Sequence, residues 1–282
     1  MPAHADPLRV ALQIGLYIFF YLLFLSLFAL SGLAALLGML AGSALGVFVS
    51  AVATNILTLR IYEGRSLADI GFHWNRTSAH NLVWGLVGGI ASALVALAGP
   101  LATHAASLQP GGMEAHWRTF VWVSLMLVFG AAGEEVLFRG YGFQVLLRSA
   151  GPYSTVLPVG VLFGLLHAFN PHPSYISVAN TAAFGVLFGY AFLRSRDLWL
   201  PFGLHFGWNF TLPLFGAPVS GLKIGITGYE MQWNAGALWS GGDYGPEASI
   251  LCSGVLVALF VFVRKAPIRS QRNLLLDEPV EK

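Results

Sequence analysis

Long apolar runs, separated by short stretches that hold the charged residues, dominate the pattern of hydrophobic and polar positions along the chain. Roughly 20 apolar residues span about 30 Å of hydrocarbon as a helix, so such runs predict transmembrane helices. Eight are predicted, at Val10–Leu30, Leu33–Leu57, Asn81–Leu101, Phe120–Leu147, Tyr153–Phe169, Tyr175–Leu193, Leu198–Phe215 and Ala248–Val263. The fifth and the seventh are short and contain Pro and Gly, which indicates tilted or broken helices.

The basic residues between these runs predict how the chain is oriented in a membrane. Of the fifteen Lys and Arg residues, twelve fall on one side of the predicted spans, and Arg118 and Lys223 fall on the other. The remaining one, Arg139, lies inside a span. Lys and Arg concentrate in cytoplasmic loops, so both termini are predicted to be cytoplasmic, which requires an even number of spans.

The composition also places the chain among membrane proteins. It is 56% hydrophobic and 10% charged, with a mean hydropathy of +0.69, whereas soluble domains carry about 25% charged residues. We therefore expect an all-α polytopic membrane protein with about eight transmembrane helices. A single transmembrane domain is predicted over residues 1–264, and a polar cytoplasmic tail, expected to be disordered, over residues 265–282. The compact chain favours a bacterial inner membrane.

Two classes of site are excluded at this stage. Outside the flanks of the predicted spans the sequence has no basic cluster, which argues against binding to nucleic acid. The single cysteine, Cys252, lies in an apolar run and excludes an intrachain disulfide or a CxxC metal site.

Charged residues inside one apolar run point to a functional site. Glu134 and Glu135 are the acidic residues within the predicted spans, and Arg139 follows in the same run. Each would cost about 2.5–3.5 kcal/mol at the centre of a bilayer, so we expect them to face a protected cavity and to pair. Glu135 and Arg139 are four residues apart, which predicts an ion pair on one helix face. Glu134 points about 100° away and stays available as a base, although a purely structural ion pair is an alternative explanation.

Two histidines lie in other predicted spans, each with a partner four residues away. His167 follows Phe163, and His205 precedes Asn209, so each pair shares one helix face. Either histidine alone is more often a packing or interfacial residue. The patterns EExxxR, FxxxH and HxxxN, on three separate spans and in that order, together form a specific constellation.

This constellation resembles the CPBP family of intramembrane endopeptidases, also called the Abi or CAAX prenyl protease 2 family. The resemblance covers roughly Tyr62 to Phe215, including the stretch IGFHWN, and no motif position departs from the family pattern. It implies an eight-helix peptidase with a buried catalytic cavity, which acts on a membrane-embedded or lipid-anchored protein or peptide. By this resemblance Glu134 would activate water, His167 would assist, and His205 with Asn209 would stabilise the oxyanion. The supporting residues of the motifs would be Glu135, Arg139 and Phe163.

A bound metal is the alternative to the implied glutamate chemistry, because the family is often described as metalloproteases. Catalytic zinc accepts two histidines and a carboxylate with a water in the fourth position, so Glu134, His167 and His205 could be ligands. The sequence has no HExxH motif. We favour a glutamate mechanism without a cofactor and keep zinc as the alternative.

Other functions remain open. A non-catalytic scaffold or a bacteriocin-immunity protein, roles that some members of the resembling family are thought to play, would keep the fold without needing Glu134. Buried Glu, His and Arg also mark the ion pathways of transporters, but the motifs do not recur in a second half of the chain. Two intramembrane histidines could bind haem, although adjacent carboxylates make a poor haem environment. Nothing in the sequence identifies a prenyl-binding groove.

The predicted spans leave one conflict. His167 falls close to the outer end of its span, whereas His205 falls nearer the inner end of its own. If both belong to one site, a helix must be broken or shifted, and Pro171 or Pro201 could mark the place.

Overall fold

Helices occupy all eight apolar runs in the computed structural model, which describes residues 6–112 and 116–277. Those in the predicted spans are α1 (Pro7–Leu30), α3 (Met39–Tyr62), α4 (Arg76–Ala102), α5 (Trp117–Arg139), α7 (Pro152–Leu166), α8 (Tyr175–Ser195), α9 (Trp199–Leu214) and α11 (Ile250–Lys265). Shorter elements are α2 (Leu33–Leu37), α6 (Tyr141–Ala150), α10 (Ala237–Ser240) and α12 (Leu274–Asp277), with the 3-10 turns η1 (Leu67–Ile70), η2 (His167–Phe169), η3 (Gly242–Tyr244) and η4 (Pro246–Ala248). A small antiparallel sheet pairs β1 (Ala106–Pro110) with β2 (Tyr229–Trp233).

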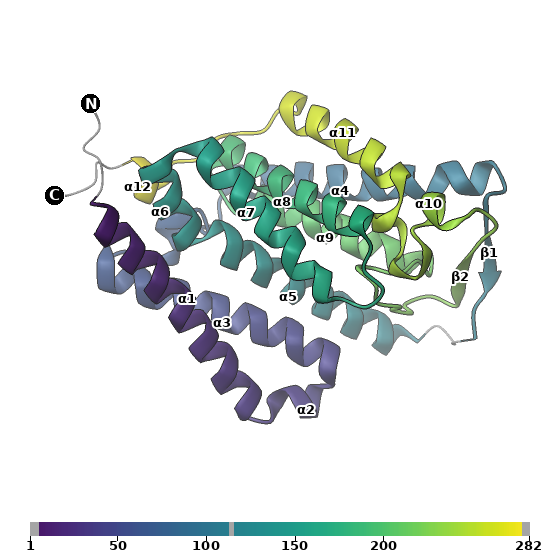
Figure 1. Ribbon diagram of the computed structural model, residues 1–282, viewed down its shortest axis with the longest axis horizontal. Coiled ribbons are helices and arrows are strands. Elements are labelled where there is room, and N and C mark those ends of the chain that lie inside the picture. Colours follow the sequence, from purple (N-terminus) through teal and green to yellow (C-terminus); the bar gives the residue numbers. More distant parts are fainter. Residues whose placement is uncertain (1–5, 113–115, 278–282) are drawn as a thin grey trace.

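Six helical segments of the described chain are long and apolar enough to cross a bilayer. They are Pro7–Leu30, Met39–Tyr62, Arg76–Ala102, Trp117–Ala150, Pro152–Phe169 and Tyr175–Ser195. The helices α9 and α11 have 16 residues each, a length of about 24 Å at 1.5 Å per residue, and belong to the same bundle (Figure 1). The chain is an all-α polytopic membrane protein, as predicted, while the count of eight spans stays a prediction.

Two predicted spans are interrupted by glycine. Gly38, at φ +83°, separates α2 from α3, in a backbone conformation that costs glycine little. Gly140 separates α5 from α6, where a Cβ atom would lie 2.3 Å from Oδ1 of Asn55. The same Asn55 oxygen accepts a hydrogen bond from the amide of Tyr141 at 2.7 Å. The close approach of Asn55 thus explains why the long run beginning before Glu134 ends as two helices.

Glycines also bring α4 against α9, the helix that contains His205 and Asn209. A Cβ atom at Gly85 would lie 2.5 Å from the carbonyl oxygen of Leu200, and one at Gly89 would lie 2.3 Å from that of Leu204. On the other side Gly203 approaches the backbone of α4 just as closely. Small residues four apart allow such contact between helices in lipid. The position of α9 is therefore fixed by backbone contact.

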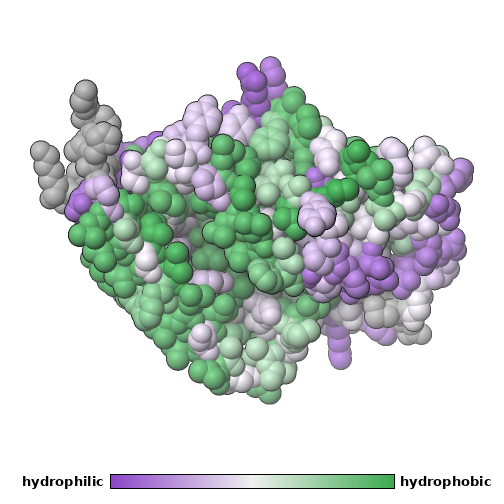
Figure 2. Space-filling view, in the orientation of Figure 1, coloured by the Kyte–Doolittle hydropathy of each residue, from purple (hydrophilic) through white to green (hydrophobic). Residues whose placement is uncertain are grey.

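The two ends of the bundle differ in character. The start of α1 lies at the same end as α12, and the β1–β2 sheet lies at the opposite end (Figure 1). Figure 2 shows hydrophobic residues over the part of the surface formed by α1 and hydrophilic residues gathered at the end with the sheet. Along α1 the side chains of Leu12, Leu22 and Leu27 are exposed. Such a surface suits contact with lipid chains.

The prediction of a disordered tail is wrong for residues 266–277, and residues 278–282 lie outside the described part of the chain. Gln271 donates a hydrogen bond to Oδ2 of Asp197 at 2.6 Å, and Asn273 donates one to Oε1 of Gln144 at 3.0 Å. Leu275 is 1% exposed. The polar side chains that resemble a solvated tail in the sequence satisfy buried polar groups of the bundle, so the segment is held in place.

Candidate active site

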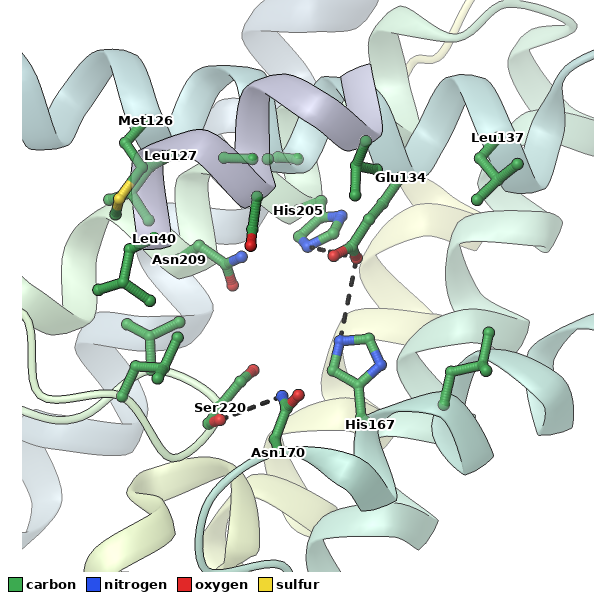
Figure 3. Close-up of a pocket in the computed structure, with 18 of the residues that line it drawn as sticks. Leu40, Met126, Leu127, Glu134, Leu137, His167, Asn170, His205, Asn209 and Ser220 are labelled. Atoms are coloured by element: carbon green, nitrogen blue, oxygen red, sulfur yellow. Dashed lines mark hydrogen bonds and ion pairs between the residues drawn. The ribbon is translucent and has the colours of Figure 1, made fainter. Parts of the chain in front are cut away.

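A cavity of about 520 Å³ lies between α1, α3, α5 and α9 and the segments that follow α7 and α9. Glu134, His167, His205 and Asn209 all line it, although they come from three helices up to 75 positions apart in the sequence. In Figure 3 the side chains of Glu134, His167 and His205 point toward one another, and Asn209 lies beside His205. The structure therefore brings together the four residues predicted from the sequence. Their catalytic roles stay predictions.

Glu134 projects from the second half of α5 into this cavity. Gly133, next to it, lets α3 approach so closely that a Cβ atom there would lie 2.7 Å from the amide nitrogen of Phe48. The Glu134 side chain is 30% exposed, but its Oε2 atom is buried and has no hydrogen-bond partner among the described residues. Oε2 lies 3.9 Å from Nε2 of His167 and 3.8 Å from Nε2 of His205, distances beyond a direct hydrogen bond.

The neighbouring carboxylate, Glu135, is committed to other partners. Its Oε1 atom lies 3.2 Å from Arg139 Nη1, which confirms the predicted ion pair, and both side chains are almost fully buried. Arg139 also donates to the carbonyl oxygen of Gly185 at 2.7 Å and lies over the ring of Phe163. A buried pair needs such additional bonds to offset the loss of water around the charges.

Glu135 makes a second contact that the sequence does not reveal. The same Oε1 atom accepts a hydrogen bond from Nδ1 of His205 at 2.9 Å. This contact joins α5 to α9 and turns the Nε2 edge of the imidazole toward Glu134. The ring of Phe188 stacks on His205, with a centroid distance of 4.9 Å and an interplanar angle of 15°. The imidazole is thus fixed at one edge by a charge and on one face by an aromatic ring.

His167 is fixed in a similar way by its own helix. Its Nδ1 atom lies 2.8 Å from the carbonyl oxygen of Phe163, and because a carbonyl can only accept, Nδ1 must hold the proton. Nε2 then faces Glu134. The Phe163 ring is 2% exposed and lies 4.6 Å from the His167 ring and 6.0 Å from the His205 ring, measured between centroids. The aromatic position in the FxxxH motif therefore separates and supports both imidazoles.

The two histidines line one cavity although His205 lies in the first half of α9 and His167 lies at the end of its own helix, α7. This helix has 15 residues, about 22 Å, and ends at Leu166, so His167 lies at its C-cap. Asn170 is extended, as expected for a residue before proline, and Pro171 follows the turn η2. Pro201 lies in the first turn of α9 and does not break it. Of the two prolines considered, Pro171 marks the end of the helical segment.

Sequence reasoning missed several residues around the cavity. Asn170 and Ser220 lie across it from Asn209 and His205 (Figure 3), and the Asn170 amide donates to the Ser220 carbonyl oxygen at 3.1 Å. Ser220 belongs to a Gly-rich loop after α9, where no local pattern singles it out. On the lipid-facing side, α1 and α3 contribute mainly apolar side chains, among them Leu25 and Leu40.

The donor types of the site suit zinc, but their arrangement does not. Glu134, His167 and His205 supply a carboxylate and two imidazoles. Across residues 6–112 and 116–277, no three His, Cys, Asp or Glu side chains are grouped so as to hold a metal ion. We therefore derive no chemical step through a metal.

Residues 116–211 match the model of a protein family described as Rce1-like, type II CAAX prenyl endopeptidase Rce1-like. The matched segment is shorter than the region of resemblance, Tyr62 to Phe215, and it includes every residue of the three motifs. No curated protein and no solved structure matches the chain. The matched family model agrees with the ordered motifs, and residues 116–211 are consistent with the CPBP, or CAAX prenyl protease, family of intramembrane peptidases.

Proposed function

We propose that the protein is an endopeptidase that hydrolyses a peptide bond of a membrane-embedded or lipid-anchored protein or peptide by using water activated by Glu134. One observation carries the proposal. The buried Oε2 atom of Glu134 faces the Nε2 atoms of His167 and His205 at 3.9 and 3.8 Å, inside a cavity that can admit a substrate. Arg139 pairs with Glu135, and among the residues that the structure describes no guanidinium forms an ion pair with Glu134 that would prevent it from acting as a base.

The distances around Glu134 suit a bridging water. They are too long for direct hydrogen bonds, yet one water can contact two polar atoms about 4 Å apart. In the proposed step the water gives a proton to Glu134 while its oxygen bonds to the carbonyl carbon of the substrate. The resulting tetrahedral centre collapses as its carbon–nitrogen bond breaks, and Glu134 returns the proton to the departing nitrogen. The products are a carboxylic acid and an amine, so no oxidant or co-reactant is needed.

The hydrogen bonds of the two imidazoles give them different roles. Nδ1 of His167 holds its proton, so Nε2 of the neutral ring can accept a hydrogen bond from the attacking water. Nδ1 of His205 donates to an ionised carboxylate, so Nε2 of that ring can donate only in the imidazolium form. Flanked by Glu134 and Glu135, an imidazolium would be electrostatically favoured. It would stabilise the developing oxyanion, with the Asn209 amide as a second donor.

The walls of the cavity indicate how a substrate would reach the site. The α1 and α3 side is apolar and faces the hydrophobic surface of the bundle, whereas the catalytic groups lie on α5, at the C-terminal end of α7 and on α9. An extended membrane-associated segment could enter from the bilayer and present its peptide bond to Glu134. We also propose, from the distribution of Lys and Arg, that the multi-pass chain has both termini in the cytoplasm.

The decisive experiment compares the unaltered protein with Glu134→Ala and His205→Ala in the native host, after checking that each variant accumulates. Membrane-protein fragments identified by mass spectrometry should be present with the unaltered protein and absent with both variants. General-base catalysis typically contributes about 10²–10⁴-fold to the rate, so fragment levels should differ greatly between the unaltered protein and the variants. If both variants retain full host function, the peptidase proposal fails and a non-catalytic scaffold role remains.

A second measurement separates the glutamate mechanism from the zinc alternative. The purified protein is assayed before and after treatment with a strong chelator, alongside elemental analysis for bound metal. Cleavage that survives chelation supports water activation by Glu134 alone. Cleavage that disappears and returns with added zinc would assign Glu134, His167 and His205 to a metal.

A further inference from the structure

A third carboxylate lies close to the catalytic residues, outside the three motifs. Glu247 is in η4, just before α11, and is 4% exposed. A small cavity of about 20 Å³ separates its side chain from His167, His205 and Asn209. Burial raises the pKa of this carboxyl group, although hydrogen bonds to it act in the opposite direction. Burying an acidic side chain is costly, so a simple packing role would be better served by an apolar residue.

The hydrogen bonds of Glu247 join two separate parts of the site. Its Oε1 atom accepts from the indole nitrogen of Trp208 at 3.2 Å, and Trp208 lies next to Asn209 on α9. Its Oε2 atom accepts from the backbone amide of Ser220, and the Ser220 hydroxyl donates to Oε1 at 3.3 Å. Oε1 therefore contacts chiefly α9, and Oε2 contacts the loop that contains Ser220.

The loop segment held by Glu247 has a backbone conformation that needs support. Ser220 has φ +50°, in the left-handed region that residues with a side chain rarely adopt. Its carbonyl oxygen accepts from Asn170, three residues after His167, and Gly221 donates to the carbonyl oxygen of Tyr244 at 2.8 Å. The turn at Ser220 is thus fixed from two sides, and it connects the segment after His167 to Glu247.

We propose that Glu247 is a positioning residue of the peptidase site. It keeps the oxyanion donors of α9, His205 and Asn209, correctly placed relative to the cavity wall that Ser220 forms. It acts through Trp208 on the orientation of α9 and through Ser220 on the closure of the cavity opposite Glu134. This inference rests on the proposed peptidase function. It assigns no contact between Glu247 and the substrate.

Two substitutions at position 247 separate this role from simple packing. Glu247→Gln keeps the size of the side chain but replaces one carboxylate oxygen by an NH2 donor, so either the acceptor that faces Trp208 or the one that faces the Ser220 amide is lost. Glu247→Asp keeps both oxygens on a shorter chain. Asp243→Asn is the matched control, because Asp243 is an exposed acidic residue four positions earlier. Each variant is purified, checked for thermal stability, and assayed with a fluorogenic peptide copied from a fragment that the host comparison identifies.

We expect Glu247→Gln to lower kcat about ten- to a hundredfold per mole of folded protein, since it loses a hydrogen bond to a charged group near the reacting atoms. KM should change much less, because the substrate does not contact Glu247. Glu247→Asp should recover part of kcat, and Asp243→Asn should behave like the unaltered protein. If Glu247→Gln does not accumulate, Trp208→Phe tests the same link by removing the indole donor, with a smaller expected loss of kcat.

The outcomes distinguish the two proposals. If Glu134→Gln is inactive but Glu247→Gln and Trp208→Phe keep kcat within twofold, the positioning role is overturned and the peptidase function stands. The role is also overturned if Glu247→Gln and Glu247→Asp lose stability equally and keep full kcat. If Glu134→Gln cleaves the peptide as fast as the unaltered protein, the peptidase function itself is wrong.

Discussion

Replacing Arg139 by methionine tests whether the buried charges on α5 act as a unit. Arg139 is completely buried, so Arg139→Met removes a cation and leaves a carboxylate behind. Among the described residues the Glu135 side chain would keep His205 as its partner, and the carbonyl oxygen of Gly185 would lose its bond to the guanidinium. Methionine retains much of the volume that fills the space beside Phe163, which limits the contribution of a cavity.

The size of the effect follows from the burial of the pair. Removing one partner of a buried ion pair typically costs about 3–5 kcal/mol, because the other charge stays in a medium of low polarity. The Glu135 side chain is 1% exposed and cannot regain water without a local opening. The double variant Glu135→Gln/Arg139→Met should lose less stability than the two single variants together, because it leaves no unpaired charge.

The assay is thermal unfolding of the purified protein in one detergent and at one scan rate, combined with peptide cleavage. Asp277→Asn is the control, since it breaks the exposed ion pair with Arg196 and should cost no more than about 1 kcal/mol. Arg139→Met should unfold at a clearly lower temperature and lose cleavage, because the Glu135 carboxylate that contacts His205 would lose the guanidinium that fixes its orientation. A melting temperature like that of Asp277→Asn, or losses that simply add in the double variant, would refute the reasoning.

Three further predictions concern other parts of the structure. Asn209→Ala should lower kcat about 10²–10³-fold with little change in the melting temperature, as expected for loss of an oxyanion donor, and steady-state kinetics will show it. Burial raises the pKa of Asp197, so the folded state favours the protonated carboxyl group. The melting temperature of the protein, compared with that of Asp197→Asn, should therefore rise as the pH falls through this raised pKa, and this gain should disappear as the pH rises through it. Truncation after Lys265 should lower the melting temperature, because it removes the Gln271 donor to Asp197; an unchanged temperature would contradict this account of the tail.

Local features were predictable from the sequence because they depend on neighbours along one helix. The apolar runs determine where helices form, and the four-residue spacing of Glu135 and Arg139 places both on one face whatever else surrounds them. The ordered motifs identified Glu134, His167, His205 and Asn209 as one group, and the structure places them around one cavity.

Contacts between distant segments could not be predicted in the same way. Glu135 meets His205 only because glycines let α9 lie close to α4, which places the imidazole near α5. Glu247 lies one residue before a predicted span, so the sequence predicts that it belongs to an external loop. In the structure it lies in η4 and contacts Trp208. The polar composition of the tail predicts disorder. Its amide side chains pair instead with groups of the bundle that no local pattern reveals.

The most direct test follows the oxygen of the attacking water. The purified protein in lipid nanodiscs is incubated with the peptide in ¹⁸O-labelled water, next to Glu134→Gln and to Glu230→Gln, a control at an exposed acidic residue. The account predicts a new carboxyl terminus containing ¹⁸O from the unaltered protein and from Glu230→Gln, and none from Glu134→Gln. Labelled product formed at the same rate by Glu134→Gln would contradict the claim that Glu134 activates the water.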